Sequence, residues 1–136
     1  MTYYIYTLQN QANLKIYVGY TENPKTRWRC ERNQANNIKS AEYNRPLHRA
    51  IRKYGWDNFK KQIIEEFDDQ IEALEAEKFW IEFFRTNRKK YGNEYGYNLH
   101  EGGVHPRAKG TKYARTKKLN VLKISRNNIN NVFQRL

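Results

Sequence analysis

The stretches Tyr3-Tyr-Ile-Tyr-Thr-Leu8 and Lys15-Ile-Tyr-Val-Gly-Tyr20 decide the fold of this 136-residue chain. Both are rich in aromatic and β-branched side chains, and the turn-forming residues 10–13 separate them, which together predict a β-hairpin. If residues 10–13 form a four-residue loop, Tyr6 lies directly opposite Tyr17 and both side chains point to one face of the sheet. The sequence therefore predicts that two phenols share one patch.

Capping residues and hydrophobic periodicity define the elements that follow. A helix is expected over residues 24 to about 35, because Asn23 can cap its start and Pro24 suits its first position. By the same criteria we expect a helix from Pro46 to Gly55, a strand over residues 59–67, and a long helix from Asp69 to about Arg85. The order β-β-α-α-β-α has too few strands for a sandwich and lacks the repeated βαβ units of a doubly wound sheet, so we expect the α+β class.

The chain is strongly basic. It has 26 Lys and Arg against 14 Asp and Glu, a net charge of +12 and a pI near 9.8. Such a balance favours a polyanionic partner, nucleic acid before membrane, and the alternative is a basic surface that is merely solvated. Residues 105–136 hold nine basic and no acidic side chains. We therefore expect a folded domain over residues 1–104 and a basic C-terminal tail over residues 105–136.

Cysteine usage and hydropathy bear on the compartment. Cys30 is the only cysteine, so neither an intrachain disulfide nor a cysteine-based zinc site can form. The N-terminus has no basic-then-apolar leader, and no apolar run approaches the roughly 20 residues of a membrane span. We expect a soluble, intracellular protein of the cytoplasm.

Glu77 stands out on physical grounds alone. The residues three and four positions away on the expected helix are all apolar, so its carboxylate should lie on the buried face. A buried carboxylate costs several kcal/mol unless it is paired or bound to a metal. An internal ion pair, for example with Arg27, and a metal ligand are the two interpretations. The apolar neighbours are Ala73, Leu74, Trp80 and Ile81.

Five separated features form an ordered pattern. They are Tyr6 in Tyr-Ile-Tyr, Tyr17 in Tyr-Val-Gly, Arg27 followed by tryptophan, Glu77 within a helix, and Asn98 in Gly-Tyr-Asn. Each feature alone is weak evidence, because 11 of the 136 residues are tyrosine, but the ordered set is specific. On this pattern, residues 3 to about 103 resemble the GIY-YIG nuclease domain. The segments Pro46–Gly55, Glu77–Ile81 and Gly96–Leu99 resemble its phage and intron homing endonuclease branch.

The resemblance implies a three-stranded antiparallel sheet flanked by helices, and cleavage of DNA with Mg²⁺ or Mn²⁺. It implies catalytic roles for Tyr6 and Tyr17 as the tyrosines of the two motifs, Arg27 as the phosphate-binding arginine, Glu77 as the metal ligand, and Asn98 as the amide that completes the site. Tyr6 is then the candidate base. Because the ordinary pKa of tyrosine is near 10, nearby cationic charge would have to lower the pKa of Tyr6 or bring its ionised form into play transiently, while Tyr17 would orient Tyr6 or the water.

The chain departs from the family pattern at two places. Its first motif begins with tyrosine rather than glycine, which leaves the phenol of Tyr6 in place. Some homing members carry histidines where this chain has Glu31 and Glu42, so proton transfers assigned to those histidines do not carry over. We expect the three histidines of this chain on the surface, namely His48, His100 and His105.

The leading hypothesis is a Mg²⁺-dependent DNA endonuclease of the homing type, which hydrolyses phosphodiester bonds. The alternatives are a catalytically inactive nucleic-acid-binding module, and a repair or restriction nuclease on the same fold. DNA is the expected partner, a divalent metal the only expected cofactor, and an additional partner could supply specificity. Phosphate contacts are expected from Arg49, Arg52, Lys53, Lys60 and Lys61 and, in the tail, from Arg107, Lys109, Lys112, Arg115, Lys117 and Lys118.

Overall fold

The structure is a computed structural model, and it describes residues 1–103. The expected tail, with its six proposed phosphate contacts, lies outside the described residues, so those contacts and the domain boundary stay predictions. No helix in the described range is long and apolar enough to cross a membrane. The elements in chain order are β1 (Tyr3–Asn10), β2 (Ile16–Thr21), α1 (Pro24–Ala35), α2 (Pro46–Tyr54), the short 3-10 helix η1 (Trp56–Asn58), β3 (Phe59–Phe67), α3 (Gln70–Phe84) and α4 (Arg88–Tyr91).

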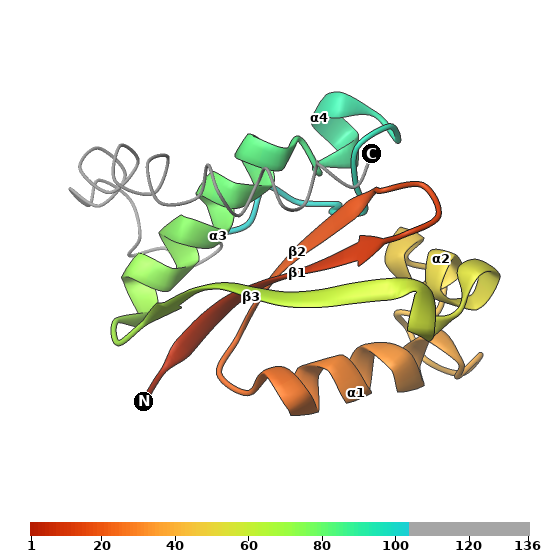
Figure 1. Cartoon of the computed structure of the whole chain (residues 1–136), viewed down its shortest axis with the longest axis horizontal. Coiled ribbons are helices and arrows are strands. Elements are labelled where there is room, and N and C mark those ends of the chain that lie inside the picture. The colour runs from red at the N-terminus through yellow and green to blue at the C-terminus, as the bar shows by residue number, and fades with distance from the viewer. Residues whose placement is uncertain (104–136) are drawn as a thin grey trace.

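The three strands form one antiparallel sheet in the order β2-β1-β3. Helix α3 lies on one side of this sheet, and α1 and α2 lie on the other (Figure 1). The architecture confirms the expected three-stranded antiparallel sheet flanked by helices. Because β1 is the central strand, its two faces supply the middle of both hydrophobic layers.

The register of the β1–β2 hairpin differs from the expected one. Tyr6 pairs with Gly19, and Tyr17 pairs with Leu8, so the two tyrosines are diagonal rather than opposite neighbours. The turn lies one residue further along the chain than expected, because the Asn10 N–H donates to the carbonyl of Lys15 and encloses residues 11–14. A shift of two positions leaves every side chain on its expected face, since the side-chain period of a strand is two. Tyr6 and Tyr17 therefore still share one face.

The asparagines of this turn are held by hydrogen bonds to a residue far along the chain. The side-chain amides of Asn10 and Asn13 both donate to the hydroxyl of Tyr97, at 3.1 and 3.2 Å. The carbonyl oxygens of the same two side chains accept backbone N–H groups two residues on, which are Asx turns. Leu14 takes a left-handed conformation, with φ of 67°, to close the loop.

The helix starts agree with their capping residues. The side chain of Asn23 accepts the N–H of Thr26 at the start of α1, and the side chain of Asp69 accepts the N–H of Glu72 at the start of α3. Gly55 ends α2 with φ of 88°, a conformation that favours glycine. These local signals confirm the bounds expected for α1, α2, β3 and α3.

Each face of the sheet has its own buried cluster. On the α3 side, apolar residues of β1, β2 and β3 pack against α3: Ile5, Ile16, Val18, Phe67, Ala73, Ala76, Trp80, Ile81 and Phe84. On the α1 and α2 side, the cluster contains both motif tyrosines: Tyr6, Leu8, Tyr17, Ala35, Leu47, Ala50, Ile51, Phe59 and Tyr97. The phenols of the two motifs are thus placed by the packing of α1 and α2.

Candidate active site

Tyr6 and Tyr17 lie together on the α1 and α2 face of the hairpin. Their ring centroids are 6.3 Å apart, and the side chain of Tyr6 is fully buried. The Tyr6 ring crosses the backbone of β2 at Gly19, where an added Cβ would lie 2.2 Å from Cζ of Tyr6. Glycine is therefore required at position 19 by a close approach. The shared patch of phenols that the sequence predicted is confirmed.

Arg27 projects from the first turn of α1 toward these phenols. Its Nε donates to the Tyr6 hydroxyl at 3.4 Å and lies 3.1 Å from Oε1 of Glu31, one helical turn further on. Its two terminal nitrogens have no hydrogen-bond or ion-pair partner within residues 1–103, and 42% of the side chain is exposed. The contacts at Nε hold the guanidinium in place, so the forked terminal N–H groups are available to an oxyanion.

Glu31 is the buried centre of a charged network. Its side chain is 1% exposed, and Oε2 lies 2.6 Å from Nε2 of His48, which is fully buried in α2. The other ring nitrogen of His48 lies 2.6 Å from the carbonyl oxygen of Glu42, so both ring nitrogens face acceptors. The expectation of a surface His48 is therefore wrong, because the carboxylate of Glu31 satisfies it inside the fold. His100 is exposed as expected, and His105 lies outside the described residues.

Arg45, which the sequence analysis did not single out, completes this network. Its Nη2 donates to the Tyr17 hydroxyl at 3.1 Å, its Nη1 lies 3.9 Å from Glu31, and its Nε lies 3.3 Å from Glu42. Arg45 thus donates a hydrogen bond to the hydroxyl of Tyr17 just as Arg27 donates one to the hydroxyl of Tyr6. Only the spacing of Arg27 and Glu31, four residues apart on a helix, could have indicated part of this arrangement in advance.

Burial and charge set the ionisation of these groups. Burial raises the pKa of Tyr6 well above its usual value and outweighs the hydrogen bond and positive charge of Arg27. Burial raises the pKa of Tyr17 in the same way. Burial also opposes ionisation of Glu31, but the hydrogen bond from His48 and the charges of Arg27 and Arg45 more than offset it, and the pKa of Glu31 is lowered. The site thus contains two neutral phenols beside an ionised carboxylate.

The pKa of Tyr6 is raised, whereas a base with a permanently lowered pKa was one of the two ways in which this phenol could act. Burial is the largest cause, and the charge of Glu31 opposes that of Arg27. Because the negative charge of Glu31 offsets the positive charge of Arg27, burial determines the direction in which the pKa of Tyr6 shifts.

Glu77 projects from α3 and is not paired with a cation of residues 1–103. Within residues 1–103 its one hydrogen bond comes from the backbone N–H of Gly103, 3.2 Å from Oε1, and Arg27 pairs with Glu31 instead. Burial raises the pKa of Glu77, and the N–H of Gly103 and the charge of Arg27 only partly offset this. The internal ion pair with Arg27 is not formed.

The donor set around Glu77 is sparse. No group of three or more His, Cys, Asp or Glu side chains in the described part of the chain is arranged to hold a metal ion. A single partly buried carboxylate without a cationic partner fits Mg²⁺, which usually keeps several waters and binds through one or two carboxylates. It does not fit zinc, which takes three or four protein ligands.

Asn98 lies at the outer edge of β2, where both halves of its amide are engaged. Its Oδ1 accepts the N–H of Val18 and its Nδ2 donates to the carbonyl of Val18, both at 2.9 Å. The backbone of residues 95–97 continues along the same edge through two hydrogen bonds with Ile16. Asn98 therefore supports β2 between Tyr17 and Gly19, and its role as the amide that completes the site stays a prediction.

The basic side chains expected to contact phosphate differ in their freedom. Arg52 is held inside the fold, because Nη1 donates to the carbonyls of Ala35 and Tyr43 at 2.8 and 2.7 Å, and its guanidinium lies 3.6 Å from the centre of the Tyr43 ring. Its first role is structural. Lys60 is half-buried, whereas three other basic side chains on α2 and β3 are exposed, namely Arg49, Lys53 and Lys61. Contact of these four side chains with DNA stays a prediction.

The site defines a known class of nuclease domain. Its parts are a β-hairpin that brings two tyrosines together, an arginine on the next helix and a glutamate on a later helix. A family model described as the GIY-YIG catalytic domain matches residues 2–91. The chain belongs to the GIY-YIG family.

Individual relatives agree with this assignment. The chain is 37% identical over 105 residues to segB of Enterobacteria phage T4, which is named as a candidate endonuclease, and the match covers 76% of this chain but 40% of that protein. Among solved structures, a mutant of the catalytic domain of intron endonuclease I-TevI matches with a TM-score of 0.61 at 25% identity, over 74% of this chain and 96% of that one. Another structure of the catalytic domain of homing endonuclease I-TevI matches with a TM-score of 0.55 at 25% identity, over 69% of this chain and 96% of that one.

Proposed function

We propose that this chain is a divalent-metal-dependent DNA endonuclease of the homing type. One observation carries the proposal: Arg27 is fixed at Nε by Tyr6 and Glu31 while its terminal nitrogens stay unpartnered within residues 1–103. A purely structural arginine would be expected to use its whole guanidinium inside the fold, as Arg45 does. The arrangement favours an active site over an inactive binding module. Between homing and the alternatives of repair or restriction, the solved relatives, which are named as an intron endonuclease and a homing endonuclease, favour homing.

Glu77 is the residue that would hold the metal. Its raised pKa reflects a buried carboxylate with too little positive charge around it, which a divalent cation would correct. When bound there, Mg²⁺ or Mn²⁺ would stabilise negative charge on the phosphate and acidify a water molecule.

Arg27 and the two phenols would act on the phosphate itself. The terminal N–H groups of Arg27 would bind two phosphate oxygens and stabilise the charge that develops as the phosphorus becomes pentacovalent. Tyr6 accepts its hydrogen bond from Arg27, so its own O–H is free to donate. With their pKa values raised, Tyr6 and Tyr17 are neutral at physiological pH and would orient the water or the phosphate as hydrogen-bond donors.

Glu31 and its partners would keep this constellation rigid. The carboxylate contacts Arg27 and Arg45, which in turn hold the two phenolic oxygens. Misplacing a reacting group by about 1 Å can lower a rate by roughly 10²-fold, so a buried anchor of this kind has catalytic value without touching the substrate. We propose that Glu31 and His48 are positioning residues.

The proposal is tested by cleavage of plasmid DNA. We expect the full chain to cut in Mg²⁺ and to stop in EDTA, and Glu77→Ala to lose cutting by at least about 10²-fold while it still binds DNA. Glu82→Ala removes an exposed carboxylate from the same helix and serves as the matched control. Mg²⁺ should raise the melting temperature of the parent but not of Glu77→Ala. If Glu77→Ala cuts like the parent, the metal does not bind at this carboxylate.

A further inference from the structure

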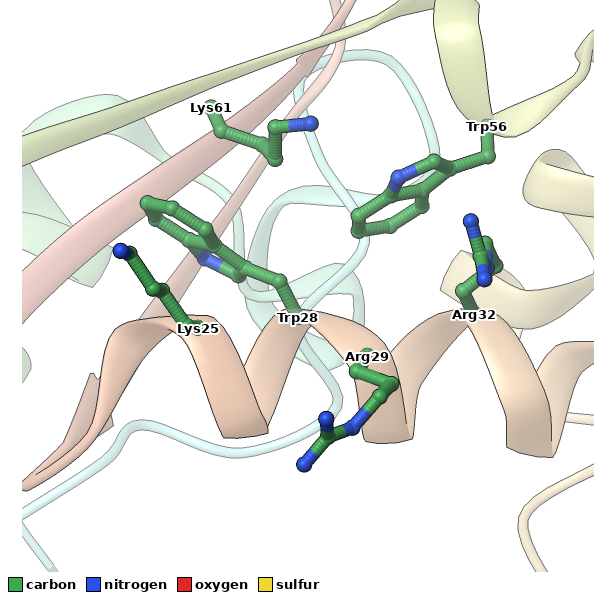
Figure 2. A pocket seen from close by; sticks show the side chains of 6 residues that line it. All are labelled: Lys25, Trp28, Arg29, Arg32, Trp56 and Lys61. Atoms are coloured by element: carbon green, nitrogen blue, oxygen red, sulfur yellow. The ribbon is translucent and has the colours of Figure 1, made fainter.

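A basic pocket opens between α1, η1 and the start of β3. Figure 2 shows its lining, with the indoles of Trp28 and Trp56 on either side of the hollow and the side chain of Lys61 above them. Its volume is about 260 Å³, below the roughly 300–1,000 Å³ of sites for drug-sized ligands. The full lining is Lys25, Trp28, Arg29, Arg32, Trp56 and Lys61, which is two aromatic rings and four cations with no acidic side chain.

This pocket shares a wall with the candidate active site. The ring of Trp28 meets the ring of Tyr6 edge to face, with centroids 6.0 Å apart and planes at 83°. A group bound against Trp28 would therefore lie one aromatic ring away from the phenol next to Arg27. On the opposite wall, the ammonium of Lys61 lies 5.2 Å from the centre of the Trp56 ring.

We propose that this pocket receives one unpaired nucleotide of the DNA, next to the phosphate that is cut. The proposal rests on the proposed nuclease function and adds a binding site to it. Indole faces offer stacking surfaces to a base, and the surrounding lysines and arginines attract its phosphates. A pocket for phosphates alone would have no use for two indoles, and bases inside a duplex cannot reach them because both of their faces are already stacked. The small volume limits the occupant to a single base.

The geometry of the site gives such a pocket a purpose. Tyr6 is fully buried, so a phosphate of a straight duplex that lies on the protein surface does not contact the phenol. A nucleotide turned out of the stack and held against Trp28 would bring its own phosphate toward Tyr6 and Arg27. Turning a base out costs a few kcal/mol, and least where it is mismatched or already single-stranded. Cutting should therefore favour DNA with an unpaired nucleotide at the cleavage position.

The test compares binding of single-stranded and fully paired DNA by the full chain in EDTA, where no cutting interferes. Trp56→Ala should weaken binding of a single-stranded oligonucleotide by roughly 5- to 150-fold, because one stacked base is lost. Its binding of paired duplex should change by less than about twofold. Trp56→Phe keeps an aromatic face and should restore most of the affinity, which separates stacking from any loss of folding.

Cation variants separate stacking from charge. Lys61→Met should weaken both kinds of DNA and lower the salt slope of binding by about one, whereas Lys89→Met removes an exposed lysine on α4 as the matched control. Single-stranded DNA should quench tryptophan fluorescence in the parent, and quench it less in Trp56→Phe. The inference is overturned if Trp56→Ala binds both kinds of DNA like the parent, because Trp56 would then contact no base. It is also overturned if the variant loses affinity for both kinds equally, as Lys61→Met does, because the pocket would then hold backbone phosphates only.

Failure of this inference can be told apart from failure of the proposed function. If the parent cuts plasmid in Mg²⁺ and Trp56→Ala keeps its full single-strand affinity, the nuclease proposal stands and the stacking pocket does not. If the parent never cuts but Trp56→Ala loses single-strand affinity selectively, the pocket stands as a binding site for an unpaired base, whereas the nuclease proposal and the placement beside a cut phosphate do not.

Discussion

Gly19→Ala is the sharpest perturbation that the structure offers, because it adds a single methyl group beneath the phenol of Tyr6. The added Cβ would lie 2.2 Å from Cζ, 2.4 Å from the hydroxyl oxygen and 2.6 Å from Cε1 of Tyr6. Unstrained carbon atoms stay roughly 3.5–4.0 Å apart. The ring must therefore move by about 1.3 Å, or the strand must bend by as much. Gly19 does not have a positive φ, so its backbone conformation is open to alanine and contact is the only cause of the effect.

The ring of Tyr6 has little room to move. Its side chain is fully buried, and the rings of Tyr17 and Trp28 flank it at centroid distances of 6.3 and 6.0 Å. Overpacking of this kind costs about 1–3 kcal/mol of stability. A displacement of about 1 Å at a reacting group can also cost roughly 10²-fold in rate. We expect Gly19→Ala to remain folded with a lower melting temperature and to cut DNA roughly 10²-fold more slowly.

The assay measures the plasmid cleavage rate and the melting temperature side by side, at a temperature where all variants are folded. Gly92→Ala is the matched control, because Gly92 has φ of +76° and no atom lies within 4 Å of its added Cβ. That variant should lose about 1–3 kcal/mol of stability through backbone strain and keep its cutting rate. The reasoning is refuted if Gly19→Ala cuts at the parental rate, or if Gly92→Ala loses cutting to the same degree.

Two further predictions concern the supports of the site. Glu31→Gln should destabilise the fold by about 1–3 kcal/mol at neutral pH in urea denaturation, because the buried His48 loses its charged hydrogen-bond partner while the two arginines stay partly exposed to water. The folded pKa of Glu31 is depressed below the ordinary 4.5. The stability that Glu31 contributes is therefore complete above pH 4.5 and is lost as the pH falls through the folded pKa. The free energy of unfolding should accordingly fall less steeply with acid in the variant than in the parent. Asn98→Ala should cost about 2–3 kcal/mol, because it leaves the N–H and carbonyl of Val18 without partners, and should slow cutting as a consequence. Normal stability with lost cutting would instead show that the Asn98 amide acts on the substrate.

The parts of the fold that the sequence predicted are those that local chemistry determines. The starts of α1 and α3 follow from Asn23 and Asp69, whose side chains accept N–H groups three residues away. The end of α2 follows from Gly55, which takes a positive φ. In each case the cause and its effect lie within one turn of the chain. Periodicity also placed the side chains of Tyr6 and Tyr17 on the correct face.

The parts that the sequence did not predict depend on partners far along the chain. The displaced hairpin turn is held by Tyr97, more than 80 residues away from Asn10 and Asn13. His48 is buried because Glu31, 17 residues earlier, offers it an acceptor in the core. Neither pairing leaves a trace in periodicity or in capping patterns. Charge balance was missed for the same reason: the effect of Arg27 on the pKa of Tyr6 depends on where Glu31 lies.

The two halves of the site are built on opposite faces of the sheet, and the segment after α4 joins them. Tyr6, Tyr17 and Arg27 belong to the layer of α1 and α2, whereas Glu77 belongs to the layer of α3. Residues 95–98 bind the outer edge of β2, and five residues later the N–H of Gly103 donates to Glu77. One short stretch of backbone thus fixes the strand that carries one phenol and also the carboxylate that would hold the metal. Because Gly96 has no room for a Cβ, which would lie 2.6 Å from the carbonyl oxygen of Ile16, this segment can lie flat against β2 only with glycine at that position. The Gly-Tyr-Asn motif therefore has a structural reason to accompany the tyrosines: its segment ties the strand that carries Tyr17 to the carboxylate that we propose binds the cation.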